Sequence, residues 1–249
     1  FLREGIEVYA ISPDPVDLLR RFADRFAIEY HLLCDADSAV IDAFGIRNTN
    51  IPEDHDWYGV PLPGMYLVDE DGRVFDKHFA ADHAVRESVN SALQERFAVD
   101  IGHDGLVTAG AEGVTVRSWF STPTIRRAQM TVLTVELNLA PGLHLYGRPL
   151  PAGYIPVELQ VDGGEGLVVQ QIAYPRARPR RFEVLDETLP AYENSVQLKA
   201  HCLGMAREGT VDVSVTVRYQ ACDSTECYLP ERLTFDMNLD VLGHVAERV

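Results

Sequence analysis

Cys222 and Cys227 are the residues whose type and spacing best suit redox chemistry, because two thiols separated by four residues can form a local disulfide. Such a bond would close a loop of only six residues. The chain-entropy model gives roughly 2 kcal/mol for a loop of this size, so stability alone is a weak reason for the pair. An exposed disulfide can instead be attacked by a partner thiolate, and the released thiols can reduce another protein. The spacing alone is about equally consistent with a disulfide that undergoes exchange and with an inert structural disulfide on an extracytoplasmic β-domain.

The segments on either side of the cysteines have the pattern of β-strands. Apolar residues alternate with polar ones over residues 211–219 and again over residues 233–241. A period of two predicts one buried and one solvated face on each strand. We therefore expect the cysteines at the mouth of a hairpin-like connection, where two neighbouring strands bring Cα atoms within disulfide range.

The chain has two further cysteines, so three disulfide connectivities are open. Pairing Cys222 with Cys227 is the local choice. Cys34 and Cys202 lie in apolar, strand-like segments, and both are expected to be small buried hydrophobic residues rather than reactive thiols. Unpaired thiols are more typical of a reducing compartment, whereas disulfide exchange favours an extracytoplasmic, periplasmic location.

Composition argues against several functions. The chain has 249 residues, of which 46% are hydrophobic, and a net charge of −16. That charge argues against binding nucleic acid or an anionic membrane through bulk electrostatics. No apolar run approaches the roughly 18 residues of a membrane span. No cofactor or metal is expected, because four residues between two thiolates is not the usual zinc spacing.

The second half of the chain has the pattern of an all-β domain. After about residue 113, no stretch of ten or more residues has helical periodicity. Short strand-like segments, separated by Gly and Pro turns, are expected at residues 114–120, 130–139, 157–161, 167–174 and 196–202. Many short strands of this kind predict a β-sandwich.

Three segments of this half resemble the amino-terminal domain of the thiol:disulfide interchange protein DsbD. They are Tyr-Gln-Ala-Cys at 219–222, Cys-Tyr-Leu-Pro-Glu at 227–231 and Pro-Gly-Leu-His-Leu-Tyr at 141–146. The likeness extends over about residues 113–241, although the cysteine spacing is one residue shorter than in that family. It implies an immunoglobulin-like sandwich whose cysteine pair relays electrons between thiol–disulfide protein partners, without assigning attacking and resolving roles.

The same resemblance implies supporting residues around the pair. Tyr146 and Tyr219 are expected to pack around the two cysteines. The family shields its disulfide with an aromatic residue on a capping loop, and Phe182 is the candidate for that role. The alternative for Phe182 is an ordinary core phenylalanine. Asp223 and Glu226 could assist proton transfer, but turn formation is the better interpretation.

The first hundred residues have an α/β pattern, in which strand and helix alternate before a hairpin and a last helix at 85–97. Residues 32–37, 60–69 and 71–74 resemble the peroxiredoxin branch of the thioredoxin fold, over about residues 3–97. In that family, the proline before the corresponding strand is cis and faces the reactive cysteine. The resemblance therefore implies a cis bond at Pro63, an uncommon feature.

The family's reactive cysteine sits at the start of a helix after an earlier, central strand, and no segment here can supply it. Cys34 lies where the family usually has serine, so it is not expected to be peroxidatic. Without that central strand, the strands on either side of it would lack backbone hydrogen-bond partners. The family's layout implies about 60 or more earlier residues in the complete protein, which is consistent with a domain of at least about 150 residues. Otherwise a second copy of the chain, as a homodimer, could fill the gap.

These patterns predict an incomplete α/β thioredoxin-like domain followed by an all-β immunoglobulin-like sandwich. The expected divisions are a first domain at 1–98, a Gly-rich linker at 99–113, the sandwich at 114–242 and a tail at 243–249. The basic run at 175–181 is expected to be a solvated loop. Its alternative role is to steer an acidic partner or to lower the pKa of a thiol.

Two functions remain open. The first is a thiol–disulfide oxidoreductase, with an electron relay through Cys222 and Cys227 and a fused peroxiredoxin-like antioxidant domain. The second is a non-catalytic binding or scaffold module in which the same disulfide is structural. Fold alone does not separate them, because function depends on the site.

Overall fold

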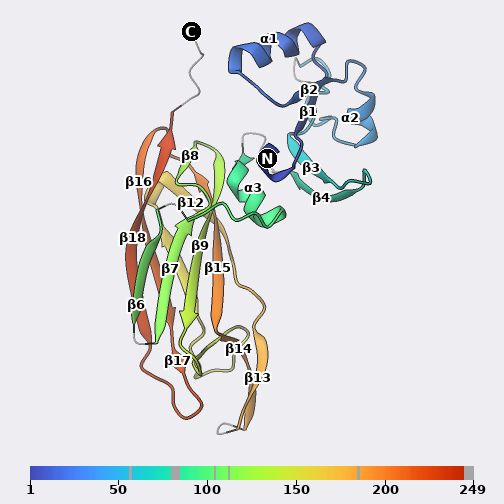
Figure 1. Ribbon diagram of the computed structural model, residues 1–249. Helices are drawn as coiled ribbons and strands as arrows, with labels where there is room; N and C mark the ends of the chain where they lie inside the picture. The colour runs from blue at the N-terminus through green and yellow to red at the C-terminus, as the bar shows by residue number, and fades with distance from the viewer. Residues whose placement is uncertain (56–57, 80–84, 104, 112, 184–185, 244–249) are drawn as a thin grey trace. The chain divides into compact units, whose positions relative to one another are not determined.

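The chain folds as two compact units. The computed structural model describes residues 1–55, 58–79, 85–103, 105–111, 113–183 and 186–243 (Figure 1). Contacts group the described residues into Phe1–Arg86 and Glu87–Gly243. The helix expected at 85–97 thus lies with the second unit, and the domain boundaries drawn at 98 and 113 remain predictions. Within the described part of the chain, no helix combines the length and apolar character needed to cross a bilayer.

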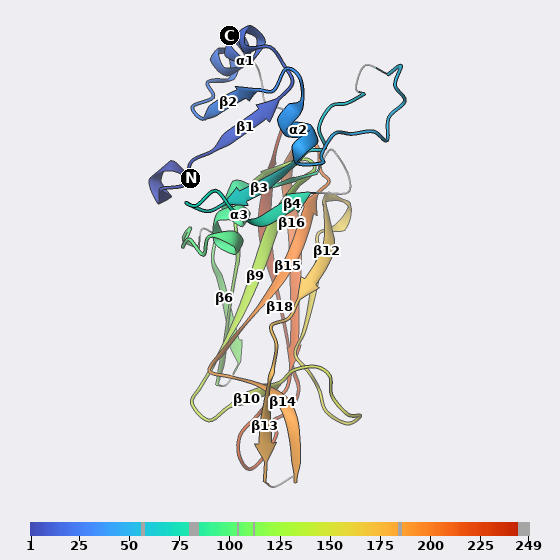
Figure 2. The same cartoon turned by 90° about the vertical axis from the view of Figure 1, so that its right-hand side faces the viewer.

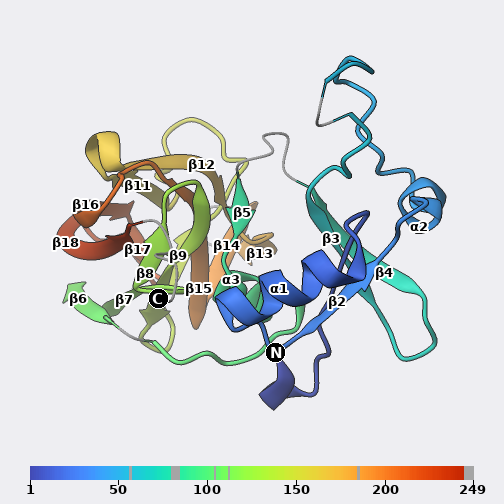
Figure 3. The same cartoon turned by 90° about the horizontal axis from the view of Figure 1, so that it is seen from above.

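The first unit is a thioredoxin-like α/β region, as predicted. Its elements in chain order are η1 (Leu2–Glu4), β1 (Tyr9–Ser12), α1 (Val16–Phe26), β2 (His31–Cys34), α2 (Ala39–Ala43), β3 (Gly64–Val68) and β4 (Val74–Phe79). β1 and β2 pair in parallel, and α1 packs against β2 (Figure 3). β3 and β4 form a separate antiparallel hairpin.

The expectation that Cys34 is buried is wrong. Its side chain is exposed, although Cys34 does end strand β2. The β1–β2 sheet is only two strands wide, and no residue of either strand is buried among the described residues. An apolar residue on so narrow a sheet has too little neighbouring structure to cover it.

The expectation of a cis bond at Pro63 is also wrong. The one cis peptide bond among the described residues precedes Pro149. Just before Pro63, Pro61 forms an isolated antiparallel bridge with Arg47, and the Leu62 N–H donates to the Ile46 carbonyl oxygen at 2.7 Å. The trans form is the ordinary one, because X-Pro bonds favour trans by about 0.5–1 kcal/mol.

The second unit is a β-sandwich with one α-helix among its described residues. Its elements are β5 (Arg86–Glu87), α3 (Val89–Arg96), β6 (Val107–Ala111), β7 (Val114–Phe120), β8 (Thr124–Arg126), β9 (Gln129–Leu139), β10 (His144–Tyr146), β11 (Glu158–Asp162), η2 (Gly164–Gly166), β12 (Leu167–Ala173), β13 (Arg178–Phe182), β14 (Glu187–Glu193), β15 (Ser195–Gly204), β16 (Gly209–Tyr219), β17 (Ala221–Cys222) and β18 (Glu231–Leu242). One sheet has the order β12-β15-β9-β7-β6, with β5 beside β9, and the facing sheet has the order β11-β16-β18-β8.

A single apolar core fills the space between these two sheets. It contains the inward-facing residues of β7, β9 and β15 from one sheet and those of β11, β16 and β18 from the other. The alternation read from the sequence is correct for β16, whose Val211, Val213, Val215, Val217 and Tyr219 are all buried. Apolar burial of this kind stabilises a fold by about 25 cal/mol per Å² removed from water. The predicted sandwich is confirmed.

Hydroxyl groups attach α3 to the sandwich. Ser88 caps the helix by accepting the N–H of Ser91 at 3.1 Å. The Ser91 hydroxyl lies 2.7 Å from that of Ser121, which follows β7, and the Ser121 hydroxyl lies 3.0 Å from that of Thr131 on β9. All four side chains are buried, so this chain of hydrogen bonds satisfies groups that would otherwise be costly to bury.

A third, smaller sheet stands at the end of the sandwich away from α3 (Figures 1 and 2). Its order is β13-β14-β10-β17. The expectation of a solvated loop at 175–181 is wrong for its second half, because Arg178–Phe182 pairs with β14 in a regular antiparallel register. Pro179 is tolerated there because β13 is an edge strand, which needs no ladder N–H at that point.

Candidate functional site

The predicted disulfide is confirmed. The Sγ atoms of Cys222 and Cys227 are bonded, and the two Cα atoms lie 3.9 Å apart as directly opposed residues of an antiparallel bridge. Its surroundings differ from the expectation of a simple hairpin between β16 and β18. After Tyr219 the chain leaves β16, and Ala221–Cys222 pairs with β10 of the small sheet instead.

The two cysteines differ in their exposure to solvent. Cys222 is 1% exposed, whereas Cys227 is exposed. β17 buries Cys222 against a separate cluster of apolar residues formed by Tyr146, Phe182, Leu189 and Ala191. Cys227 follows the turn on the solvent side. An incoming thiolate therefore has a path to the Cys227 sulfur and none of comparable openness to the other.

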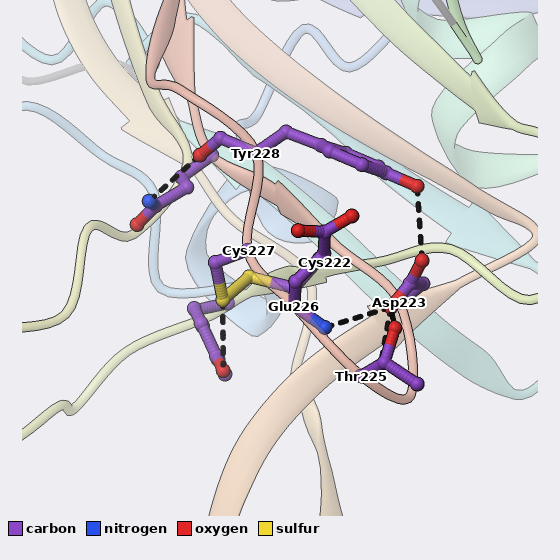
Figure 4. Close-up of a disulfide and its surroundings, with 8 residues drawn as sticks. Cys222, Asp223, Thr225, Glu226, Cys227 and Tyr228 are labelled. Atoms are coloured by element: carbon purple, nitrogen blue, oxygen red, sulfur yellow. Dashed lines mark hydrogen bonds between the residues drawn. A yellow bond between two sulfur atoms is a disulfide. The ribbon is translucent and has the colours of Figure 1, made fainter.

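A carboxylate holds the turn between the cysteines. Asp223 accepts the backbone N–H groups of Thr225 at 2.6 Å and Glu226 at 2.9 Å, and also the Tyr228 hydroxyl at 2.9 Å (Figure 4). Its own N–H donates to the Glu226 carbonyl at 2.9 Å. These hydrogen bonds favour the charged form, so they lower the pKa of Asp223 well below its ordinary range. Asp223 is therefore a turn-forming residue.

Strand β10 lines the other side of the disulfide. His144 is the direct antiparallel neighbour of Cys222, and Tyr146 places its hydroxyl 3.8 Å from the Sγ of Cys227. Residues two apart on a strand share a face, so both side chains lie on the disulfide side of the sheet. Leu145 between them belongs to the main sandwich core. Burial raises the pKa of Tyr146, which keeps its hydroxyl protonated at neutral pH.

The end of β13 forms the remaining wall. The Phe182 ring lies 4.7 Å from the His144 ring and 5.7 Å from the Tyr146 ring, and the Arg180 guanidinium lies 5.3 Å from the Phe182 ring. Arg180 also pairs with Glu193. A groove of about 320 Å³ lies between this wall and the 222–227 turn. It combines one accessible sulfur, aromatic rings and a cation in one concave surface.

His144 is a buried, neutral histidine that sequence reasoning did not single out. Burial and the nearby charge of Arg180 lower its pKa to about 4, while Glu193 and Asp223 oppose this shift. Among the described residues, neither of its ring nitrogens has a hydrogen-bond partner. His144 belongs to the segment 141–146 that carries the resemblance, but no sequence motif marks a histidine at this position as functional.

Four of the six predicted site residues come together. Cys222, Cys227, Tyr146 and Phe182 all line the groove. Tyr219 instead belongs to the main core, where burial raises its pKa to about 12. Pro63 lies in the first unit. The roles of these residues remain proposals.

The free thiol of the second unit is not part of the groove. Cys202 lies on β15 in the main core, and burial raises its pKa to about 12. A thiol that is neither accessible nor ionised is a poor nucleophile. The described part of the chain contains no group of three or more His, Cys, Asp or Glu residues arranged to hold a metal ion.

Comparison with known families agrees with this geometry. Residues 114–239 match the family model described as thiol:disulfide interchange protein DsbD, N-terminal, which covers half of the chain. The chain belongs to the DsbD N-terminal family. Its first unit matches the AhpC/TSA family model over residues 1–77. Both predicted resemblances are therefore confirmed.

Individual relatives match only parts of the chain. The thiol-disulfide oxidoreductase ResA of Halalkalibacterium halodurans is 29% identical over 79 residues, which are 31% of this chain and 38% of ResA. The chain spans less than half the length of the curated relatives that it matches.

Two solved structures are similar to part of this chain at low identity. The DsbD N-terminal domain of Neisseria meningitidis, in its reduced form, is 17% identical with a TM-score of 0.32, over 43% of this chain and 77% of that one. The N-terminal periplasmic domain of ScsB from Proteus mirabilis is 17% identical with a TM-score of 0.39, over 55% and 50%.

Proposed function

We propose that this chain is a thiol–disulfide redox protein whose Cys222–Cys227 pair carries two electrons between partner proteins. The observation that supports the proposal is the difference in exposure between the two cysteines that line the groove: Cys227 is exposed, whereas Cys222 is 1% exposed. Exchange requires access of a thiolate to one sulfur. A purely structural disulfide would not require a groove beside it.

The exchange proceeds in two balanced steps. A thiolate of the partner attacks the Cys227 Sγ, a new S–S bond forms between them, and the Cys222–Cys227 bond breaks with its electron pair going to the Cys222 Sγ. A second thiolate of the partner then attacks the partner's sulfur that is bonded to Cys227, and Cys227 is released as a thiolate. The partner leaves as a disulfide, and this chain holds two thiols. The reverse sequence passes the electrons to an oxidised acceptor.

The first unit fits the same chemistry. Its match to the AhpC/TSA family and its similarity to ResA, a thiol-disulfide oxidoreductase, support a fused redox unit that exchanges with the β-domain or reduces peroxides or disulfides. Disulfides persist in oxidising compartments, which supports an extracytoplasmic, periplasmic location. The groove beside Cys227 supports a thiol–disulfide protein as the partner.

Mixed-disulfide formation tests the proposal. The probe is a bacterial thioredoxin that retains only its attacking cysteine, activated as its thionitrobenzoate disulfide. All variants carry Cys34→Ala, because that exposed thiol would also react. Cys222→Ala, which leaves the Cys227 thiol free, is expected to form the covalent adduct about tenfold faster than Cys227→Ala, since exchange follows access. The double variant Cys222→Ala/Cys227→Ala is the blank, and equal rates in all three would refute the proposal.

A further inference from the structure

His144 and Cys222 are direct neighbours on adjacent strands. They are paired Cα positions in the antiparallel β10–β17 ladder. Side chains of directly opposed residues lie on the same face, with Cβ atoms about 4.5–5.5 Å apart. Both side chains are 1% exposed. The imidazole therefore lies on the same face of the sheet as the side chain of the buried cysteine.

The imidazole has hydrogen-bonding capacity that the oxidised protein does not use. Neither Nδ1 nor Nε2 has a partner among the described residues. The rings of Tyr146 and Phe182, with centroids at 5.3 and 4.7 Å, flank His144 without offering an acceptor for its N–H. The great majority of buried polar groups in native structures have a hydrogen-bond partner, so a buried imidazole without one calls for a functional explanation.

The charge state of His144 sets what it can do. The charged groups that face it are Arg180 on β13, Glu193 on β14 and Asp223 after β17. Burial and Arg180 keep the ring neutral at pH 7, because they lower its pKa to about 4. A neutral imidazole carries one N–H donor and one lone pair. It can thus donate to a thiolate or accept from a thiol without a change in its own charge.

Opening of the disulfide supplies the missing partner. We propose that His144 receives the Cys222 sulfur when the disulfide opens, by donating its ring N–H to the Cys222 thiolate; this inference rests on the proposed exchange at Cys227. In that step the Cys227 Sγ gains a bond to the partner's sulfur, and the Cys222 Sγ leaves with the electron pair. A thiolate buried in an apolar site lacks hydration. The N–H of His144 replaces one hydrogen bond of water, and the thiolate later takes a proton from solvent.

His144 is in this account a positioning residue that acts through the leaving sulfur. If it only filled space, a phenyl ring would serve as well, and the acidity of Cys222 would not depend on it. A hydrogen-bond donor at this position makes Cys222 a better leaving group and stabilises the reduced protein. The acidity of the Cys222 thiol therefore distinguishes a donor from a side chain that only fills space.

The test measures the pKa of the Cys222 thiol in the full chain carrying Cys227→Ala, from the ultraviolet absorbance of its thiolate as a function of pH. The blank is Cys222→Ala/Cys227→Ala. His144→Phe is expected to raise the pKa of Cys222 by about one unit, a tenfold loss of thiolate at a given pH. His144→Gln keeps an N–H donor and is expected to retain most of the effect. A Cys222 pKa that is unchanged in His144→Phe, or equally raised in both variants, would overturn the proposal.

The same variants with both cysteines present give an independent readout. At a pH above the Cys222 pKa, where the reduced protein holds the thiolate, His144→Phe is expected to shift the equilibrium with glutathione about tenfold toward the disulfide, which is about 30 mV. If His144→Phe does not fold, ring-nitrogen chemical shifts of His144 in the unaltered protein decide: a shift on reduction supports the proposal, and identical shifts refute it. None of these measurements needs a protein partner. Failure of thioredoxin exchange with an intact His144 effect would therefore refute the proposed function alone.

Discussion

The hydroxyl oxygen of Tyr146 lies 3.8 Å from the Sγ atom of Cys227, although the Tyr146 side chain is only 1% exposed. A buried ring thus places a hydrogen-bond donor beside the one exposed sulfur of the pair. The arrangement joins the packing of the small sheet to the chemistry of the disulfide, because the same residue that fills the cluster around Cys222 also contacts Cys227.

Tyr146→Phe is expected to slow the second step of exchange, in which Cys227 leaves as a thiolate. The substitution keeps the ring and removes the donor, at a cost of about 1 kcal/mol in stabilisation of the developing charge. That corresponds to about a fivefold slower decay of the mixed disulfide formed with a thioredoxin that keeps both of its cysteines, measured by stopped-flow quenching and gel analysis. The free energy of unfolding should change by no more than about 1 kcal/mol. A decay rate equal to that of the unaltered protein would exclude a role for the hydroxyl.

Phe182→Ala is expected to expose the disulfide. Phe182 lines the groove and packs on His144 and Tyr146, so its removal opens a path for small thiols. Reduction by dithiothreitol should become faster, and unfolding should cost about 3 kcal/mol less, as for other Phe-to-Ala changes in apolar clusters. Phe182→Leu is the matched control, which keeps most of the apolar volume. If reduction is no faster in Phe182→Ala, the ring is a core residue and not a cover for the disulfide.

His144 gives the fold an acid-sensitive component. Its pKa of about 4 in the folded protein is below the ordinary histidine value of about 6.5, so the unfolded chain binds a proton in this interval and the folded chain does not. Stability therefore falls as pH drops from about 6.5 to 4, by up to about 3 kcal/mol for this group. Urea unfolding at both pH values should show a smaller difference in His144→Gln. An identical difference in the two proteins would mean that His144 is not held neutral.

Asp223 titrates in the opposite sense. Its lowered pKa means that the turn gains stability from the carboxylate above the ordinary aspartate pKa and loses it as pH falls through the lower folded value. The carboxyl chemical shift of Asp223 should therefore stay constant across the interval near pH 4 where a free aspartate titrates. Asp223→Ala should speed amide hydrogen exchange at Thr225 and Glu226, whose N–H groups it accepts. Unaltered exchange at those two amides would contradict the assigned hydrogen bonds.

The sequence was sufficient for the parts of the fold with strong periodicity. The alternation in β16 and β18 predicted two paired strands, and their register brings Tyr219 opposite Glu231, next to the cysteines. The local disulfide followed from that placement. Both depend on a buried face large enough to leave a clear period of two.

The small sheet could not be predicted in the same way. β10 has three residues and β17 has two, which is too short for a periodicity, and prolines interrupt β13 and β14 at Pro179 and Pro190. The position of His144 beside Cys222 depends on this sheet, as does the difference in burial between the two sulfurs. The resemblance to DsbD located the region, but only the pairing of β10 with β17 shows which sulfur is covered.

The reduction potential of the Cys222–Cys227 pair tests the central claim most directly. The protein, with Cys34→Ala to remove the exposed free thiol, is equilibrated in dithiothreitol and glutathione buffers, and its thiols are then trapped and counted by mass spectrometry. An exchanging pair is expected between about −180 and −270 mV, the range of protein disulfide isomerase, glutaredoxins and thioredoxin. A potential below about −300 mV, typical of structural disulfides, would contradict the account.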